Sequence, residues 1–147
     1  MLILDEPTSS LDVVSQEQIL LLLKELKKKY RMTYILISHD LSVVHYMSDV
    51  IAVMYLGKLM EFGNSDAVFS QPKHPYTKAL FGSIPSIEMD NLDEIVTLKG
   101  NVPSPINPPS GCYFHTRCEC CNEKCKNEQP ELQMGKDGRQ LACWFVD

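Results

Sequence analysis

The chain has 147 residues, of which 44% are hydrophobic and 22% are charged, and its formal net charge is −5. This length allows one ordinary domain or two small ones, and the composition is that of a globular chain. The net negative charge argues against sequence-independent binding to the nucleic-acid backbone, because such binding needs clustered Lys and Arg. The longest aliphatic run, residues 19–23, is far shorter than the roughly 20 apolar residues of a membrane span.

The first part of the chain alternates between strand and helix patterns. An apolar run at residues 1–4 predicts a buried parallel strand, and a β-branched run at Thr33–Ile37 predicts a second. Residues Val13–Tyr30 have helical periodicity, and a short amphipathic stretch follows the second strand through Tyr46. This order predicts an α/β fold with a parallel sheet and right-handed crossovers. The apolar face of the long helix carries Val14, Ile19, Leu22, Leu23 and Leu26.

A β-hairpin is predicted next, at the end of the same sheet. Residues 50–56 and 59–62 have strand composition, and a tight turn at Gly57–Lys58 separates them. Gly63 is predicted to end the second strand.

Two short helices follow, at residues 65–69 and 77–81, because the prolines between them forbid one continuous helix. The core domain is predicted to end near Ser83, so that residues 1–83 form one domain. Residues 84–147 are then a proline-rich linker and a cysteine-rich tail with few large apolar residues. Only the cysteines are expected to hold this tail together.

Two acidic residues follow the first strand. Asp5 and Glu6 stand at the carboxyl end of that strand, where ligands bind in open α/β sheets. The first carboxylate suits a hydrated Mg²⁺ ion, and the second can orient and polarise an attacking water, as nucleotide hydrolysis requires. The alternative is a pair of acids that only caps an exposed strand edge.

Residues 4–12, Leu-Asp-Glu-Pro-Thr-Ser-Ser-Leu-Asp, resemble the Walker B strand and D-loop of ATP-binding cassette (ABC) ATPases. The resemblance implies that Asp5 binds Mg²⁺ and that Glu6 is the general base. It also implies that Ser10 and Asp12 belong to a D-loop that reaches toward the phosphate site of a partner across a dimer interface. Asp12 is independently predicted as the N-cap of the helix that follows.

The same resemblance predicts a histidine at the end of the next strand. Residues 37–40 are Ile-Ser-His-Asp, and His39 resembles the switch histidine of these ATPases. An imidazole at this position can donate a hydrogen bond to the γ-phosphate or position the water. His45 has no such context and is expected on a helix surface.

Three motifs of ABC ATPases do not occur in these 147 residues: the Gly-x-x-x-x-Gly-Lys-[Ser/Thr] phosphate loop, the Leu-Ser-Gly-Gly-Gln helix start and the glutamine loop. All three precede Walker B in the family, so the chain resembles the carboxyl portion of a longer ATPase that uses ATP and Mg²⁺. Without backbone amides and a lysine around the phosphates, the carboxylates repel a nucleotide. The chain alone is therefore expected not to hydrolyse ATP.

Residues 72–80 resemble the segment that follows the cassette core in ATPases of bacterial dipeptide and oligopeptide importers. That subgroup continues with a proline-rich stretch and Gly-Cys-x-Phe-x-x-Arg-Cys, present here at residues 111–118. The resemblance implies an ATPase subunit that energises peptide import from the cytoplasmic face of the membrane. Its implied partners are transmembrane permease subunits, a second ATP-binding subunit and, indirectly, a peptide-binding protein. His74 is expected to act in a turn or as a cap.

All six cysteines lie between Cys112 and Cys143. Such a dense cluster, without a secretion signal, favours metal ligation over disulfides, which are the alternative. The importer resemblance implies a 4Fe–4S cluster on Cys112, Cys118, Cys125 and Cys143. The intervening stretches of five, six and seventeen residues differ from paired C-x-x-C knuckles and favour iron–sulfur, although four thiolates also suit Zn²⁺.

Three other residues leave the ligand set open. Cys120 or Cys121 can compete with Cys118 or Cys125, and His115 is a further candidate. A structural role for the metal is expected because the tail has little apolar material, with a redox or regulatory role as the alternative. Apolar residues at 130–132 and 144–145 are expected to pack around the site.

Two further function classes are open at this stage. DNA-repair and chromosome-structuring ATPases share Walker B, the D-loop and the switch histidine, but they carry their cysteines in a coiled coil before this segment. Here the cysteines follow a proline-rich linker, and heptads are absent. The second alternative is a non-catalytic, metal-binding remnant.

Overall fold

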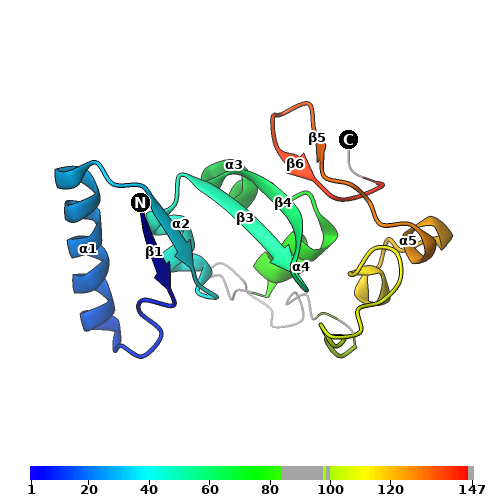
Figure 1. Ribbon diagram of the computed structural model, residues 1–147, viewed down its shortest axis with the longest axis horizontal. Helices are drawn as coiled ribbons and strands as arrows, with labels where there is room; N and C mark the ends of the chain where they lie inside the picture. Colours follow the sequence, from blue (N-terminus) through cyan, green and yellow to red (C-terminus); the bar gives the residue numbers. More distant parts are fainter. Residues whose placement is uncertain (84–97, 99, 146–147) are drawn as a thin grey trace, which may run out of the picture. The chain divides into compact units, whose positions relative to one another are not determined.

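The computed structural model describes residues 1–83, 98 and 100–145 (Figure 1). Most of the predicted linker, residues 84–97 and 99, lies outside the described residues. The chain divides into two compact units, Met1–Asp49 and Val50–Asp147. No described helix has the length and apolar composition needed to cross a bilayer.

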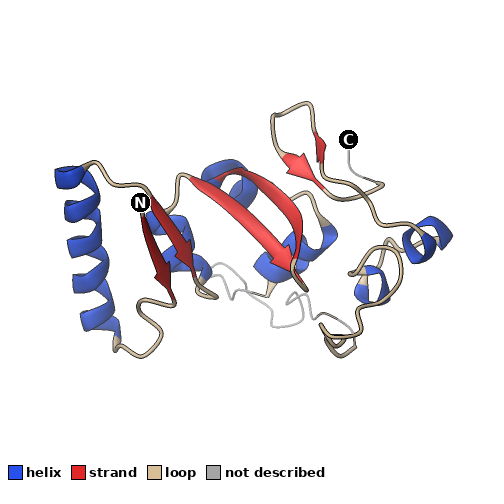
Figure 2. Ribbon diagram, in the orientation of Figure 1, coloured by secondary structure: helices blue, strands red, loops and turns tan. Residues whose placement is uncertain are grey.

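The first unit has the predicted order of strands and helices. Its elements are β1 (Leu2–Asp5), α1 (Val13–Tyr30), β2 (Tyr34–Ile37) and α2 (Leu41–Met47). The two strands lie side by side in parallel, with Leu2 opposite Tyr34 and Asp5 opposite Ile37 (Figure 2). The prediction of a parallel β-α-β arrangement is confirmed, and the bounds of α1 are those that the periodicity indicates.

Local hydrogen bonds define both ends of α1. The carboxylate of Asp12 accepts the backbone N–H groups of Val14 and Ser15, at 3.1 and 3.0 Å, so the predicted N-cap is confirmed. At the other end Arg31 adopts a left-handed conformation, with φ 50°, and its N–H bonds to the carbonyl of Lys27.

The small core of this unit lies on one face of β2. It consists of Leu20, Val43 and Met47, with Leu23, Tyr34 and Leu36 packed against them. Successive side chains of a strand point to opposite faces, so Ile35 and Ile37 point away from this core and are 45% and 51% exposed.

Two details of the sequence prediction are wrong here. Val14 and Leu22 were expected on the inner face of α1 but are 64% and 49% exposed, and Leu20 is buried instead. The strand predicted to be buried has Ile3 at 59% exposure. The physical reason is that α1 and α2 both pack on one narrow, two-stranded sheet, which covers only a small part of the apolar surface of α1.

The second unit is built around a four-stranded antiparallel sheet of order β3-β4-β6-β5 (Figure 2). Its elements are β3 (Val50–Tyr55), β4 (Lys58–Asn64), α3 (Ser65–Ser70), α4 (Pro75–Gly82), the 3-10 helix η2 (His115–Arg117), α5 (Glu123–Asn127), β5 (Gln133–Met134) and β6 (Gln140–Leu141). The predicted hairpin and both short helices are confirmed.

The position of the hairpin in the fold differs from the prediction. It was expected at the end of the first sheet, whereas β4 pairs with β6 from the cysteine-rich tail in a separate sheet. The turn residues are Leu56 and Gly57, both with positive φ (47° and 77°), and not Gly57–Lys58. Gly63 does not end the strand. A Cβ atom there would lie 2.5 Å from Cγ of Arg139, so the glycine leaves room for that side chain to cross β4.

The tail also contributes to the core of this unit. That core consists of Tyr55, Met60, Cys112, Phe114 and Cys125. Phe114 is 1% exposed and makes an edge-on contact with Tyr55, with ring centroids 5.3 Å apart. The expectation that cysteines alone order the tail is therefore wrong, because a strand pairing and a buried aromatic side chain also anchor it.

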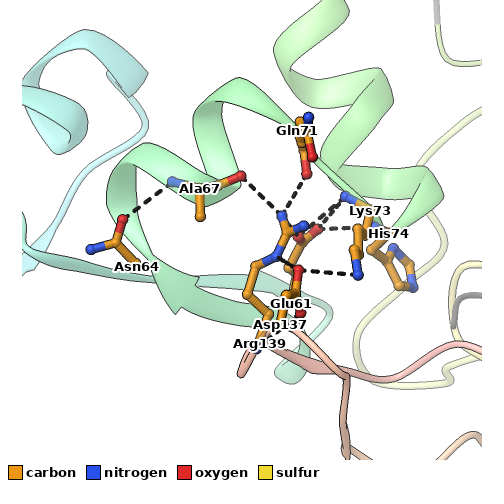
Figure 3. A network of polar contacts seen from close by, with 8 residues as sticks. All are labelled: Glu61, Asn64, Ala67, Gln71, Lys73, His74, Asp137 and Arg139. Carbon is orange, nitrogen blue, oxygen red and sulfur yellow. Dashed lines mark hydrogen bonds and ion pairs between the residues drawn. The ribbon is translucent and has the colours of Figure 1, made fainter.

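A carboxylate lies at the centre of this unit with no exposed surface. Glu61, on β4, accepts the backbone N–H groups of Lys73 and His74, the latter at 2.9 Å (Figure 3). Nη1 of Arg139 lies 3.4 Å from the same carboxylate and supplies a positive charge. Removing one member of such a buried pair costs about 3–5 kcal/mol, because the other charge stays buried without a partner.

Arg139 connects the tail to α3. Its Nη1 donates to the carbonyls of Ala67, at 3.0 Å, and of Gln71, at the carboxyl end of the helix, where a cation is favourable (Figure 3). Its Nε donates to Asp137, which also pairs with Lys73 at 3.1 Å. The hydrogen bonds from Arg139 and Lys73 hold the pKa of Asp137 well below its usual range.

Gly111 provides a test of how the tail is packed. Its φ is +63°, and a Cβ atom would lie 2.4 Å from the carbonyl oxygen of Cys125. Gly138 has a similar φ of +78° but open space around it. Gly138→Ala should cost about 1 kcal/mol of unfolding free energy for the unfavourable φ, and Gly111→Ala about 1–3 kcal/mol more for the clash.

Urea unfolding followed by fluorescence of the single tryptophan, Trp144, measures both changes in this unit. Equal losses for the two variants would contradict the close approach of Gly111 to α5.

Candidate functional site

The two acidic residues predicted after the first strand, here called the acidic corner, lie where β1 ends. Asp5 is the last residue of the strand, and Glu6 follows with φ +46°, rare for a non-glycine residue. The backbone N–H of Glu6 donates to the carbonyl of Ile37 at the end of β2, at 2.9 Å. This bond brings the residues after the two strands together.

Glu6 and His39 are in direct contact, although 33 residues separate them. Oε1 of Glu6 lies 2.8 Å from Nδ1 of His39 and also accepts the backbone N–H of His39 at 3.1 Å. The imidazole is 79% exposed, so water screens the pair. The hydrogen bond to Glu6, and then the charge of Glu6, raise the pKa of His39. The corner thus holds a carboxylate beside a group that readily carries a proton.

The other predicted nucleotide-site residues are Asp5, Ser10 and Asp12. Asp5 and Ser10 are exposed, and the carboxylate of Asp12 is engaged in capping α1. Among the described residues, neither Ser10 nor Asp12 hydrogen-bonds to Glu6 or His39. Hydrogen bonds from Ser15 lower the pKa of Asp12.

Sequence reasoning missed Asp40. Its carboxylate accepts the N–H groups of Ser42 and Val43 and so fixes the start of α2 directly after His39. The signal was present, because an aspartate just before an amphipathic stretch is a common N-cap.

A second candidate site lies in the tail, where four cysteines line one small cavity. They are the four predicted ligands, Cys112, Cys118, Cys125 and Cys143. The rest of the wall consists of His74, Pro75, Phe114, His115, Pro130, Trp144 and Phe145. The expected packing around these cysteines is confirmed for residues 130 and 144–145 but not for Leu132, which is exposed and does not line the cavity.

Backbone hydrogen bonds bring these cysteines together. The left-handed conformation of Gly111 lets the N–H of Cys112 bond to the carbonyl of Cys125, at 2.8 Å. The side chain of Asn122 caps α5 by accepting the N–H of Cys125 at 3.1 Å. Cys143 belongs to the segment that follows β6 and lies two residues after the end of that strand.

All six cysteines are free thiols in the structure. Burial raises the pKa of Cys112 and Cys143, and it raises the pKa of Cys118 to about 12. These thiols therefore stay protonated at neutral pH, and only a bound cation would favour their thiolate forms. Within residues 1–83, 98 and 100–145, no three His, Cys, Asp or Glu side chains are grouped closely enough to hold one metal ion. The metal site stays a prediction.

The two remaining cysteines lie outside the cavity wall. Cys120 is exposed, and Cys121 is close to Cys125 without lining the cavity. His115 does line the cavity, and its Nδ1 lies 2.9 Å from the carbonyl oxygen of Cys112.

His74 lines the cavity as well, but its ring is already engaged. It is 1% exposed, and Nδ1 accepts the backbone N–H of Tyr76 at 3.0 Å, which caps α4. Burial lowers the pKa of His74 to about 4. The prediction that His74 acts as a cap is confirmed.

Comparison with known proteins identifies relatives of this chain. Residues 60–125 match the family model of the oligopeptide/dipeptide transporter C-terminal region. The chain is 46% identical over 143 residues to the dipeptide transport ATP-binding protein DppF of Haemophilus influenzae, a match that covers 97% of this chain and 44% of the relative. The chain is thus similar, over nearly its whole length, to part of a peptide-transport ATP-binding protein.

Two further relatives show the same similarity. The putative oligopeptide transport ATP-binding protein YkfD of Bacillus subtilis is 48% identical over 144 residues, which are 97% of this chain and 44% of the relative. The di/tripeptide transport ATP-binding protein DppF of Pseudomonas aeruginosa is 44% identical over 146 residues, which are 99% of this chain and 45% of the relative. The chain thus spans less than half the length of these relatives, and it matches their C-terminal region.

The contact between Glu6 and His39 predicts a measurable titration. We expect the His39 imidazole to titrate above the ordinary value of about 6.5, and Glu6→Gln to lower its pKa toward that value. Because the folded-state pKa is raised, the contact stabilises the fold below the unfolded-state pKa, and this contribution is lost as the pH rises through the folded-state pKa. NMR of the imidazole resonances measures both effects.

Glu17→Gln is the control, since it removes an equivalent exposed carboxylate on α1 without touching the corner. A His39 pKa that does not change in Glu6→Gln would show that the contact is absent in solution.

Proposed function

We propose that this chain forms part of an ATP-hydrolysing subunit that energises the import of di- and oligopeptides across a bacterial cytoplasmic membrane. The observation that carries the proposal is the Glu6 carboxylate, held 2.8 Å from Nδ1 of His39 beside two parallel strands. The names of the relatives, which transport dipeptides, di/tripeptides or oligopeptides, support the substrate class.

Each residue of the corner has a proposed role. Asp5, exposed at the end of β1, holds a hydrated Mg²⁺ ion, which when bound offsets the charge of the nucleotide phosphates. Glu6 is the general base that takes a proton from the attacking water. His39 orients Glu6 through its ring and backbone and contacts the γ-phosphate. Ser10 and Asp12 belong to a D-loop at the interface with a second ATP-binding subunit.

The proposed partners follow from the same assignment. They are transmembrane permease subunits, a second ATP-binding subunit and, indirectly, a peptide-binding protein, so that the subunit works at the cytoplasmic face of the membrane. Similarity to transport proteins supports this reading over a DNA-repair ATPase or a non-catalytic remnant. The net charge of −5 gives no support for a nucleic-acid partner.

A substitution of Glu6 tests the catalytic proposal. In a chimera that joins the preceding half of the Haemophilus influenzae relative to this chain, Glu6→Gln should lower kcat about 10²–10⁴-fold and leave ATP binding intact. The amide keeps the shape of the side chain but cannot accept a proton. Steady-state phosphate release and equilibrium nucleotide binding measure the two quantities.

Glu17→Gln should match the parent chimera, and the 147-residue chain alone should show no turnover because it lacks a phosphate loop. Turnover of Glu6→Gln within a few-fold of the parent would refute the role of Glu6 as base.

We further propose that the cysteine cavity holds a 4Fe–4S cluster on Cys112, Cys118, Cys125 and Cys143, with Zn²⁺ as the alternative metal. Four free thiols line one cavity, and its remaining wall is made of histidine, proline and aromatic side chains without a carboxylate, so the types of donor match such a cluster. Among the described residues, no three of them are grouped at metal-binding distance. When bound, the cluster supplies thiolate–iron bonds that join three stretches of residues 84–147, the proposed C-terminal extension of a domain at residues 1–83.

Anaerobic purification tests this second proposal. The protein should be brown, with iron and inorganic sulfide, and serine at any of the four ligand positions should reduce both contents. Cys120→Ser and Cys121→Ser are matched controls that should keep the cluster. Stoichiometric zinc in place of iron would contradict the iron–sulfur assignment, and six cysteines paired as disulfides under reducing conditions would contradict any metal.

A further inference from the structure

Three of the six cysteines lie in one short turn between η2 and α5 (Figure 1). The backbone N–H of Cys121 donates to the carbonyl of Cys118 at 3.3 Å, so residues 118–121 form a β-turn with Glu119 and Cys120 at its centre. The first and last residues of this turn have the C-x-x-C spacing, which is typical of redox-active cysteine pairs.

The turn brings Cys118 and Cys121 to a separation that a disulfide can span. The first and fourth Cα atoms of a β-turn lie less than about 7 Å apart, and a disulfide joins Cα atoms about 4.4–6.8 Å apart. Both side chains pack against the core around Phe114, so both point to the inner side of the turn. Cys120 is exposed and is not among the residues packed there.

Other cysteine pairs near this turn are less suited to react. Cys120 and Cys121 are adjacent, and a disulfide between neighbouring residues closes a strained ring. Cys112 and Cys125 are only 8% and 6% exposed, so a reagent in solution does not reach either thiol. Cys118 and Cys121 are both partly exposed, and the thiol of Cys121 lies at the surface. They are therefore the pair that is both close together and within reach of a reagent.

We propose that Cys118 and Cys121 form a reversible disulfide across this turn when the chain meets a low-molecular-weight disulfide such as oxidised glutathione. The Cys121 thiolate attacks one sulfur of the reagent, forms a mixed disulfide and releases one thiol. The Cys118 thiolate then attacks the Cys121 sulfur and releases the second thiol. Two electrons pass to the reagent, and the protons of the two cysteines end on the two released thiols.

The disulfide changes the cysteine cavity. Cys118 lines that cavity and Cys121 does not, so the pairing removes one of its four thiols. The reaction needs no metal and does not depend on the proposed cluster. Where a cluster forms, cluster and disulfide compete for Cys118, because a metal ligand has to be a free thiolate.

Peptide mapping of the full chain identifies the pair. The chain is freed of metal with a chelator and incubated with oxidised glutathione, and its remaining thiols are then alkylated. Trypsin cleaves after Arg117 and Lys124 and releases residues 118–124, which should carry one internal disulfide and one alkyl group, on Cys120. Further cleavage after Glu119 should leave the two cysteine-containing pieces linked, and dithiothreitol should separate them.

Serine substitutions test which cysteines are needed. Cys118→Ser and Cys121→Ser should each lose the internal disulfide, and Cys118→Ser should accumulate the mixed disulfide with glutathione at Cys121. Cys120→Ser, the matched control in the same turn, should form the internal disulfide at the unsubstituted rate.

The peptide map of the unsubstituted chain decides the proposal even if a variant folds poorly. An internal disulfide that includes Cys120 or Cys125, or mixed disulfides with glutathione alone, would overturn the inference. Neither result bears on the iron content of the anaerobically purified protein, so this proposal and the cluster proposal can fail separately.

Discussion

The carboxylate of Glu61 is the feature on which the second unit depends. It has no exposed surface, and a buried charge is tolerated only when hydrogen bonds and an opposite charge compensate for lost hydration. Here two backbone N–H groups and the guanidinium of Arg139 do so. The N–H groups belong to the segment just before α4, and Arg139 belongs to the tail. The carboxylate therefore connects β4 to the two segments that carry His74 and Cys143 to the cavity.

The two candidate sites differ in how water reaches them. The pair of Glu6 and His39 is exposed, so its contact is weak and is easily exchanged for contacts with a ligand. The cysteine cavity is enclosed by aromatic and proline side chains, and burial raises the pKa of three of its thiols. The first arrangement suits a site where a substrate enters and leaves, and the second suits a group that is bound permanently.

Local features were predictable from the sequence because they depend on residues only a few positions apart. The bounds of α1, its Asp12 cap, the hairpin and the cap formed by His74 all follow from periodicity, turn residues or short motifs. Burial was less predictable. Leu22 belongs to the apolar face of α1 but stays exposed, since how much of a helix is covered depends on the width of the sheet beneath it.

By itself the sequence determined the element order and the family resemblance at residues 4–12 and 72–80, and that resemblance pointed to the four cysteines that line one cavity. Only the tertiary structure decided that the tail adds a strand to the hairpin and that Glu61 pairs with Arg139, 78 residues away. It also decided that His74 and Cys143, far apart in the sequence, line one cavity. Rules that relate residues a few positions apart cannot predict such contacts, because a buried polar group can be satisfied by any donor that the fold brings within reach.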